Sequence, residues 1–390
     1  MQTAVISRRN RSARLLFTGA AAALATATAL AGGPARAQAA GRPAAAPGTA
    51  AAPAVVYVAC DNSGTVTPIT VATRKPGPQI EIGNHADLIA ITPDGATAYV
   101  ADETDNTVTP IDTATNTALQ AIPVGGDPAA IAITPNGKTA YVANATSGTV
   151  LPISTATNQP GKPIKVGQGP AGIAITPNGR TAYVTDGGGG TVTPIDVATG
   201  KALPAIPVGT GPLAIAITHD GQTAYVANYD SGTGDTITPI DTGTNTAGPA
   251  ITVGTGPRAI VISPNGQTAY VANLGSGTVT PIDTATNGAG LPITVGTEPI
   301  AIAFTPDSAT AYVVNFGPGT VSPVDVATGM AGAPIKVGSF PRSVVVAPSG
   351  RTAFVANGAN ASVTPINTAT NEADAGIRVG GGPVFLAIKP

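Results

Sequence analysis

The side chains best able to do chemistry in this sequence occupy loop positions that recur about every 42 residues. One of these positions precedes a recurring proline and the other follows it. Most occurrences of the two positions carry glycine or a small aliphatic residue. Arginine at such a position can pair with a carboxylate or phosphate, and histidine beside a carboxylate can exchange protons. The occurrences that depart from the pattern are His85, Asp87, Asp127, Arg258, Glu298, Phe340 and Arg342.

A second set of loops departs from the pattern in the same half of the chain. The loop with Tyr229, Asp230 and Asp235 contains a three-residue insertion, and Leu274 and Phe316 replace small residues at the equivalent place in the next two units. We expect both sets of loops on one face, where they would form a shallow binding site with Arg258 and Arg342 as anion donors. The competing interpretation is ordinary variation in solvated loops.

The sequence favours no catalytic, metal or cofactor site. Its two histidines, His85 and His219, are expected on opposite faces, so a shared zinc or copper ion is not predicted. The acidic segment 102–106 lacks the ligand spacing of a calcium loop, and no nucleophile elbow accompanies His85. We therefore predict no catalytic residue, no metal and no cofactor.

These loops belong to a repeat whose clearest phrase is Thr268–Asn273, read as TAYVAN. One clean copy contains four strand candidates separated by turn signals, at 259–263 (a), 268–272 (b), 278–283 (c) and 291–295 (d). Pro281 in strand c recurs in every unit and predicts a bulge or an early strand break there. The aromatic residue of the phrase recurs at Tyr57, Tyr99, Tyr141, Tyr183, Tyr225, Tyr270, Tyr312 and Phe354.

Units of this length with four strands and no helical periodicity predict an all-β fold, a closed β-propeller of four-stranded antiparallel blades. Seven complete units begin at Leu88. Strands b, c and d alone precede them from about Val55, and a lone strand a follows at Val384–Ile388. We expect these two incomplete parts to pair as an eighth blade, with seven blades as the alternative if the first unit packs outside the ring.

The N-terminal region indicates export. Arg8, Arg9, Arg11 and Arg14 precede an apolar run and an Ala-Arg-Ala cleavage pattern, so residues 1–37 are predicted to be a signal peptide, with Sec export favoured over the twin-arginine route. Residues 38–54 are predicted to be an Ala/Pro-rich flexible spacer before the propeller at 55–390. We expect no membrane span after cleavage and a protein that is secreted or associated with the cell envelope. A net charge of −2 and the absence of tryptophan argue against nucleic acid as a partner.

The segments ITPNGKTAYVAN (133–144) and SGTVTPIDTATN (276–287) resemble the YVTN-type β-propeller repeat. The resemblance covers essentially all of residues 55–388. It implies a relation to propellers of surface-layer proteins and exported bacterial proteins, and to quinoprotein amine dehydrogenase-like propellers and sugar lactonases. Members of the family are mostly binding or scaffolding modules, and the repeat motif carries over no catalytic residue. The proline of strand c is a departure, because the family usually has an aliphatic residue there.

The resulting hypothesis is an exported, non-enzymatic and monomeric propeller. It would bind a cell-envelope protein, a glycan or a small ligand on the face formed by the d–a and b–c loops. The alternative is a hydrolase of the sugar-lactonase type, in which His85, Asp87, Glu298 and the arginines meet in a polar channel mouth. A third possibility is a structural spacer with near-identical loops and no pocket.

Overall fold

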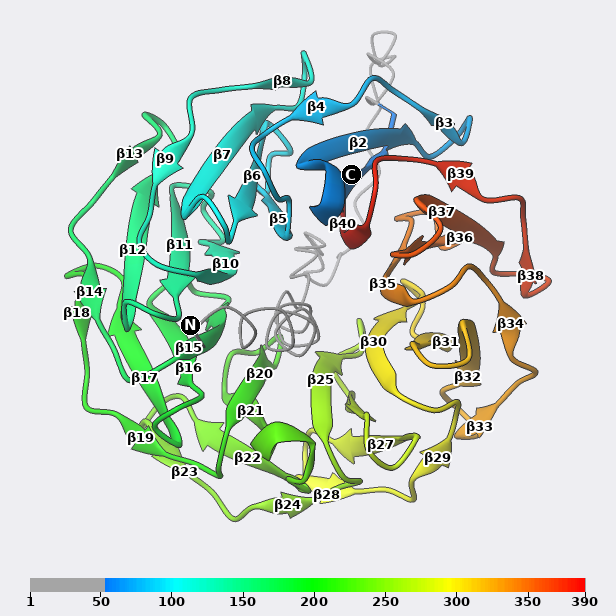
Figure 1. Cartoon of the computed structure of the whole chain (residues 1–390). Coiled ribbons are helices and arrows are strands. Elements are labelled where there is room, and N and C mark those ends of the chain that lie inside the picture. Colours follow the sequence, from blue (N-terminus) through cyan, green and yellow to red (C-terminus); the bar gives the residue numbers. More distant parts are fainter. Residues whose placement is uncertain (1–52, 390) are drawn as a thin grey trace, which may run out of the picture.

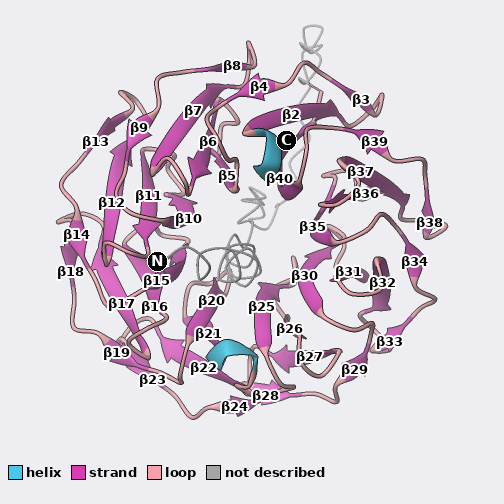
Figure 2. Ribbon diagram, in the orientation of Figure 1, coloured by secondary structure: helices cyan, strands magenta, loops and turns pink. Residues whose placement is uncertain are grey.

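The chain forms a ring of eight blades around a central axis, as the computed structural model of residues 53–389 shows (Figure 1). Within each blade the antiparallel strands run from a, nearest the axis, to d at the outer rim. The described residues contain only two short 3₁₀ helices, η1 (Asp61–Ser63) and η2 (Asp230–Gly232), both in b–c loops (Figure 2). No helix among them is long and apolar enough to cross a membrane. We number the blades from Leu88, so the blade that contains both chain ends is blade 8.

The strands repeat with nearly constant bounds. Strands a are β5 (Leu88–Ile91), β10 (Pro128–Ile133), β15 (Pro170–Ile175), β20 (Pro212–Ile217), β25 (Pro257–Ile262), β30 (Pro299–Phe304), β35 (Pro341–Val346) and β40 (Pro383–Lys389). Strands b are β1 (Val55–Cys60), β6 (Thr97–Asp102), β11 (Thr139–Asn144), β16 (Thr181–Asp186), β21 (Thr223–Asn228), β26 (Thr268–Asn273), β31 (Thr310–Asn315) and β36 (Thr352–Asn357). Strands c are β2 (Thr65–Thr70), β7 (Thr107–Asp112), β12 (Thr149–Ser154), β17 (Thr191–Asp196), β22 (Thr236–Asp241), β27 (Thr278–Asp283), β32 (Thr320–Asp325) and β37 (Ser362–Asn367).

Strand d is split in every blade into two pieces of two residues each. The pairs are β3 (Lys75–Pro76) and β4 (Ile80–Glu81), β8 (Thr117–Ala118) and β9 (Ile122–Pro123), β13 (Gln159–Pro160) and β14 (Ile164–Lys165), β18 (Lys201–Ala202) and β19 (Ile206–Pro207), β23 (Thr246–Ala247) and β24 (Ile251–Thr252), β28 (Gly288–Ala289) and β29 (Ile293–Thr294), β33 (Met330–Ala331) and β34 (Ile335–Lys336), and β38 (Glu372–Ala373) and β39 (Ile377–Arg378).

The ring closes through the C-terminal strand, which confirms the prediction of eight blades. Strand β40 pairs antiparallel with β1, with Val58 opposite Leu386 and Val56 opposite Ile388. The first and last parts of the described chain therefore share one sheet (Figure 1). The predicted signal peptide (1–37) and most of the predicted spacer (38–54) lie outside the described residues.

The TAYVAN phrase fills the spaces between blades. Because successive side chains of a strand point to opposite faces, Tyr270 packs toward blade 6 with Phe304, whereas Val271 packs toward blade 4 with Tyr225. The tyrosine hydroxyls also join neighbouring blades. Tyr225 donates a 2.5 Å hydrogen bond to Oδ1 of Asn287, which lies in the c–d turn of the next blade. The same bond recurs from Tyr57, Tyr99, Tyr183 and Tyr312 to Asn116, Asn158, Asn245 and Asn371.

The bulge predicted in strand c is wrong, and the bulge lies in strand a instead. Tyr270 pairs with Pro281 without a register shift, whereas the register of β25 shifts between Pro257 and Ala259. Pro281 is tolerated because its nitrogen faces the gap between β28 and β29, and its carbonyl there accepts a 2.8 Å bond from Gly290 N. Strand a thus begins two residues before the predicted Ala259. The predicted strand d at 291–295 contains only β29, while β28 precedes it and Leu291 between the two pieces is exposed.

In blades 1, 2, 3, 6 and 7 the last residue of strand b hydrogen-bonds to the d–a loop that leads into the same blade. Asn315 and Asn357 accept hydrogen bonds from Gly296 N (3.1 Å) and Gly338 N (3.0 Å) and donate to hydroxyls of strand c. In blade 3 this residue is Asp186, whose carboxylate accepts from Gly167 N, Thr191 and Thr193. Burial raises the pKa of Asp186, although these hydrogen bonds oppose the rise.

We expect Asp186→Asn to stabilise the protein at pH 7. A raised pKa means that the folded state disfavours the ionised carboxylate, and that penalty is present only above the pKa of the unfolded chain. Thermal melts should therefore give a higher midpoint for Asp186→Asn at pH 7 and equal midpoints near pH 3. The reverse substitution, Asn315→Asp, should lower the midpoint at pH 7. A gain that persisted unchanged at pH 3 would contradict the electrostatic origin.

Candidate functional site

Two columns of residues meet between blades at the end of the ring that carries the d–a and b–c loops, which we call the mouth. One column is the bulged residue of strand a, directly after the proline position. The other is the first residue of the b–c loop in the preceding blade. Ile300 of blade 6, for example, packs against Leu274 of blade 5, so each contact joins two neighbouring blades. The chemistry of the mouth therefore depends on which pairs of side chains the columns bring together.

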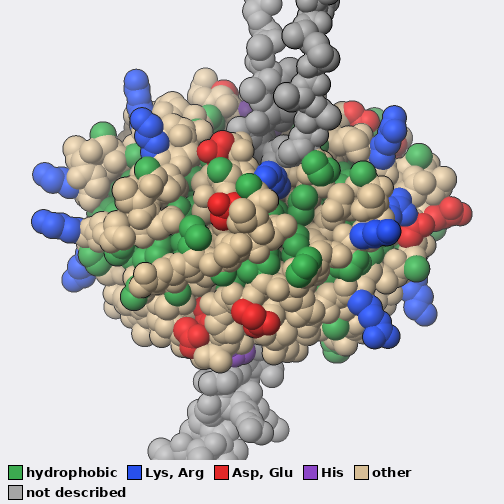
Figure 3. Space-filling model, turned by 90° about the horizontal axis from the view of Figure 1, so that it is seen from above, with side chains coloured by type: hydrophobic (Ala, Val, Ile, Leu, Met, Phe, Trp, Pro, Cys, Tyr) green, Lys and Arg blue, Asp and Glu red, His purple; other side chains and the backbone are tan. Residues whose placement is uncertain are grey.

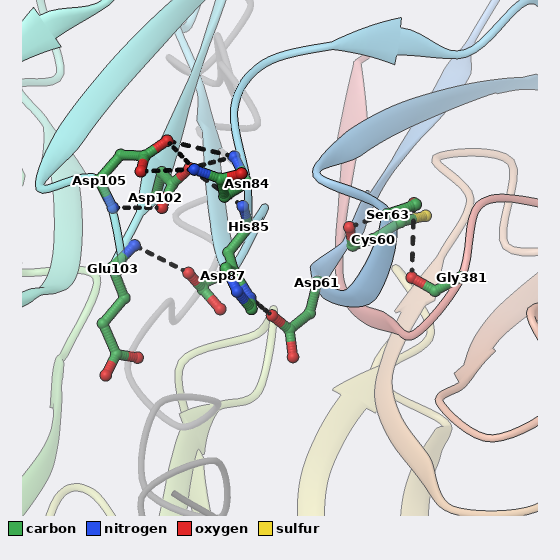
Figure 4. Close-up of polar contacts among 10 residues, drawn as sticks. All are labelled: Cys60, Asp61, Ser63, Asn84, His85, Asp87, Asp102, Glu103, Asp105 and Gly381. Carbon is green, nitrogen blue, oxygen red and sulfur yellow. Dashed lines mark hydrogen bonds and ion pairs between the residues drawn. The ribbon is translucent and has the colours of Figure 1, made fainter.

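At the junction of blades 8 and 1 the two columns bring together two aspartates, Asp61 and Asp87, and His85 lies beside them. Asp61 lies in η1, and His85 and Asp87 lie in the loop that leads into β5 (Figure 4). His85 Nδ1 hydrogen-bonds to Asp61 Oδ1, and Asp87 Oδ2 accepts a 2.9 Å bond from the backbone amide of Glu103. One ligand atom from each of Asp61, His85 and Asp87 lies within 4.8 Å of the others.

A network behind these side chains holds the loop in place. Asp102, at the end of β6, accepts hydrogen bonds from the backbone amides of Asn84 (2.9 Å) and His85 (3.0 Å). Asp105 accepts from the Asn84 side chain and donates its amide to Asp102 (Figure 4). Asp102 and Asp105 therefore position His85 through the backbone, and this use accounts for the acidic segment 102–106.

The environment shifts the proton affinity of both His85 and Asp87 upward. Partial burial disfavours the imidazolium, but the hydrogen bond and charge of Asp61, together with Asp87 and Asp102, outweigh it and raise the pKa of His85. Burial raises the pKa of Asp87 above its usual range. The bond from the Glu103 amide opposes this shift, and the charges of Asp61 and Glu103 add to it. Asp61 and Asp87 are only 4% and 6% exposed, so the pair of carboxylates is largely removed from water.

At the junction of blades 4 and 5 the pair is Tyr229 and Arg258. Arg258 is 3% exposed and hydrogen-bonds to Tyr229, yet its Nε and Nη1 have no partner among residues 53–389. Burial lowers the pKa of Arg258 to about 10. Tyr229 opposes this shift and the charge of Arg342 adds to it, so the guanidinium is still protonated at neutral pH. No carboxylate of the described residues forms an ion pair with Arg258.

At the junction of blades 6 and 7 an arginine lies against aromatic rings. The guanidinium of Arg342 lies over the ring of Phe316, 5.6 Å from its centroid. Phe316 also stacks on Phe340, with ring centroids 5.0 Å apart, and Phe340 is 50% exposed. Burial lowers the pKa of Arg342, while the charge of Asp61 opposes this shift. The mouth is thus acidic at blades 8 and 1 and basic at blades 5 and 7.

Most other basic side chains are elsewhere. Exposed residues of strand d, among them Lys75, Lys165, Lys201, Lys336 and Arg378, extend their charges into solvent, and Figure 3 shows lysine and arginine side chains projecting from the rim of the disc. A polar groove of about 540 Å³ lies beside Lys336 and Arg378, and no mouth residue lines it. Arg258 is therefore buried and Arg342 partly buried, whereas the basic side chains of the rim are exposed.

Of the eleven binding residues predicted from the sequence, seven join the mouth pairs: His85, Asp87, Tyr229, Arg258, Phe316, Phe340 and Arg342. Asp127 bonds within its loop region, with its amide donating to Asn106 (2.6 Å) and its carboxylate accepting from Thr146 (3.3 Å). Glu298 is exposed, and Asp230 and Asp235 belong to the insertion around η2, where Asp230 accepts from Thr233. Glu298 meets the mouth pairs through its backbone, since its carbonyl accepts a 3.0 Å bond from the Phe316 amide.

The sequence-based prediction omitted Asp61. The sequence pattern could have identified it, because Asp61 directly follows strand b and so occupies the same repeat position as Tyr229, Leu274 and Phe316. The omission has a physical cause: Asp61 meets His85 only because the b–c loop of one unit packs against the d–a loop that leads into the next.

The fold is shared with other eight-bladed and related propellers. Hydrazine synthase from Kuenenia stuttgartiensis is similar over 72% of this chain and 95% of that chain, with 25% identity and a TM-score of 0.60. Apo AztD from Citrobacter koseri is similar over 86% and 98%, with 14% identity and a TM-score of 0.68. The dihydro-heme d1 dehydrogenase NirN, in complex with DHE, is similar over 85% and 74%, with 15% identity and a TM-score of 0.73.

These likenesses show the β-propeller fold alone, and they point to no particular activity, because the neighbours include both enzymes and proteins not named as enzymes. No family model and no curated protein matches the chain. The YVTN-type label therefore rests on the repeat residues alone.

Proposed function

We propose that the protein is an exported, monomeric and non-enzymatic propeller that binds an acidic glycan of the cell envelope at the d–a/b–c mouth of its channel. The observation that carries the proposal is Arg258. A buried guanidinium with two unpartnered nitrogens is costly, and a bound anion would offset that cost by accepting charge-assisted hydrogen bonds.

The rest of the basic side suits the body of such a ligand. Arg342 adds a second guanidinium close enough to lower the pKa of Arg258, so both charges favour the same anion. Phe340 presents a half-exposed ring stacked on Phe316, and an apolar surface beside charged donors accommodates the C–H face of a sugar. A carboxylated sugar combines both features.

Calorimetry with an oligosaccharide of glucuronic acid tests this proposal. We expect binding to the wild-type chain that weakens as salt is added, and at least a 100-fold loss in the double variant Arg258→Leu/Arg342→Leu, because two charge-assisted hydrogen-bond donors of about 1.5–3 kcal/mol each are removed. The matched control is Arg180→Ala/Arg351→Ala, which removes two exposed arginines from a–b turns. Equal affinity in the two double variants would refute a site at the mouth.

A hydrolase of the sugar-lactonase type is the second candidate, and one observation favours it. His85 contacts Asp61 and lies beside Asp87, so an imidazole and two carboxylates converge as acid–base chemistry requires. Turnover of aldonolactones by the wild-type chain, lost in His85→Gln, would replace the binding proposal with this one. Binding of the glucuronic oligosaccharide without turnover of either compound would exclude it.

A further inference from the structure

Asp61, His85 and Asp87 form a set of potential metal ligands that the proposed glycan site does not use. They come from two blades, with Asp61 on η1 and the other two on the loop before β5 (Figure 4). One donor atom of each lies within 4.8 Å of the other two. Around an ion bound at about 2.1 Å, neighbouring ligand atoms are separated by about 3–4 Å, so small side-chain rotations would bring all three onto one ion.

The burial of the two carboxylates also favours a cation at this place. Both are more than nine-tenths buried. Within residues 53–389, the hydrogen bonds to these side chains use Asp61 Oδ1 and Asp87 Oδ2, which leaves Asp61 Oδ2 and Asp87 Oδ1 available to a ligand. Two buried carboxylates in close proximity repel one another, and a divalent ion between them would replace that repulsion with attraction.

We propose that Asp61, His85 and Asp87 bind one divalent transition-metal ion of the Zn²⁺ class at the blade 8–blade 1 side of the channel mouth. A set of two carboxylates and one imidazole suits ions that accept both oxygen and nitrogen ligands. It suits Ca²⁺ and Mg²⁺ less, because these ions favour all-oxygen shells. This proposal departs from the sequence-based prediction of no metal, because buried carboxylates would supply the ligands beside His85.

The surroundings support this role. Asp102 holds the backbone amide of His85 at 3.0 Å, and the Glu103 amide holds Asp87 Oδ2 at 2.9 Å, so both ligands are fixed by outer contacts. Three protein ligands leave at least one position of a tetrahedral ion open to water or to a ligand in the mouth. The proposal does not depend on the glycan site, and either can fail alone.

Calorimetric titration of ZnCl₂ into the chelator-stripped full chain tests it. We expect one Zn²⁺ per chain with a micromolar or lower Kd, and little competition from millimolar Mg²⁺. Asp61→Asn, His85→Gln and Asp87→Asn should each weaken binding at least tenfold. The controls are His219→Gln, on an exposed a–b turn, and Asp127→Asn, in the equivalent loop of the next blade; both should bind as the wild type does.

Two further measurements keep the test decisive. Far-UV circular dichroism and thermal melts establish that each variant is folded, and if an aspartate variant is not, His85→Gln decides, because the His85 side chain is one-third exposed. Co²⁺ substitution should produce visible absorption bands that disappear in His85→Gln. No heat up to millimolar Zn²⁺, or unchanged binding in His85→Gln, would overturn the proposal, as would loss of binding in His219→Gln.

Discussion

A chain that ends at Gly382 is expected to unfold at a thermal midpoint about 10 °C or more below that of the full chain. The truncation removes β40, whose Phe385, Leu386 and Ile388 are buried between blades 7 and 1. Burial of each large apolar side chain contributes about 1.5–3 kcal/mol, so the loss is on the order of 5 kcal/mol. The truncation also exposes the inner edge of β1, which invites aggregation.

Differential scanning calorimetry of three proteins checks this expectation. Deletion of residues 389–390 alone is the control, because it retains the pairs from Val56 with Ile388 to Cys60 with Pro383. A synthetic peptide of residues 383–390 should restore part of the lost midpoint when added to the truncated chain. A truncated chain that melts within about 2 °C of the full chain would show that β40 does not hold the ring closed.

Arg258→Leu is expected to stabilise the unliganded protein by about 1–3 kcal/mol, because it removes a buried charge and two unsatisfied nitrogen donors. Leucine fits the position, since the equivalent residues Leu213 and Ile300 are buried in blades 4 and 6. Urea unfolding measures the gain. The same variant should lose affinity for the acidic oligosaccharide, so stability and binding should change in opposite directions.

Arg342→Leu provides the contrast. The guanidinium of Arg342 lies over the Phe316 ring and is attracted by the negative charge of Asp61. Because Arg342→Leu removes both favourable interactions, it should not raise the free energy of unfolding. A loss of stability in Arg258→Leu would contradict the view that Arg258 is retained at a cost to folding. In that case the arginine would be a structural residue, and the proposed anion site would lose its main support.

Much of the fold could be predicted from local pattern. Glycine turns, apolar strands and the TAYVAN phrase recur at a constant period, and each blade is stabilised by the same contacts, so eight copies imply eight blades. The bulge predicted at Pro281 was wrong because a missing N–H disrupts a strand only where the neighbouring strand offers a carbonyl to accept it. That neighbour, strand d, is interrupted where Pro281 faces it, as the bond from Gly290 N to the Pro281 carbonyl shows.

The sequence by itself determined the repeat, the blade count, the closure by the C-terminal strand and the loop columns that carry unusual side chains. These follow from local periodicity, because every unit must bury the same faces against its neighbours. Only the tertiary structure decided which unusual side chains meet. Asp61 and His85 are 24 residues apart in the sequence. Arg342 lies near the other end of the chain, yet the charge of Asp61 opposes the fall in its pKa that burial causes. Ring closure places blades 7, 8 and 1 side by side, and burial at those junctions then sets the charge and proton affinity of the mouth.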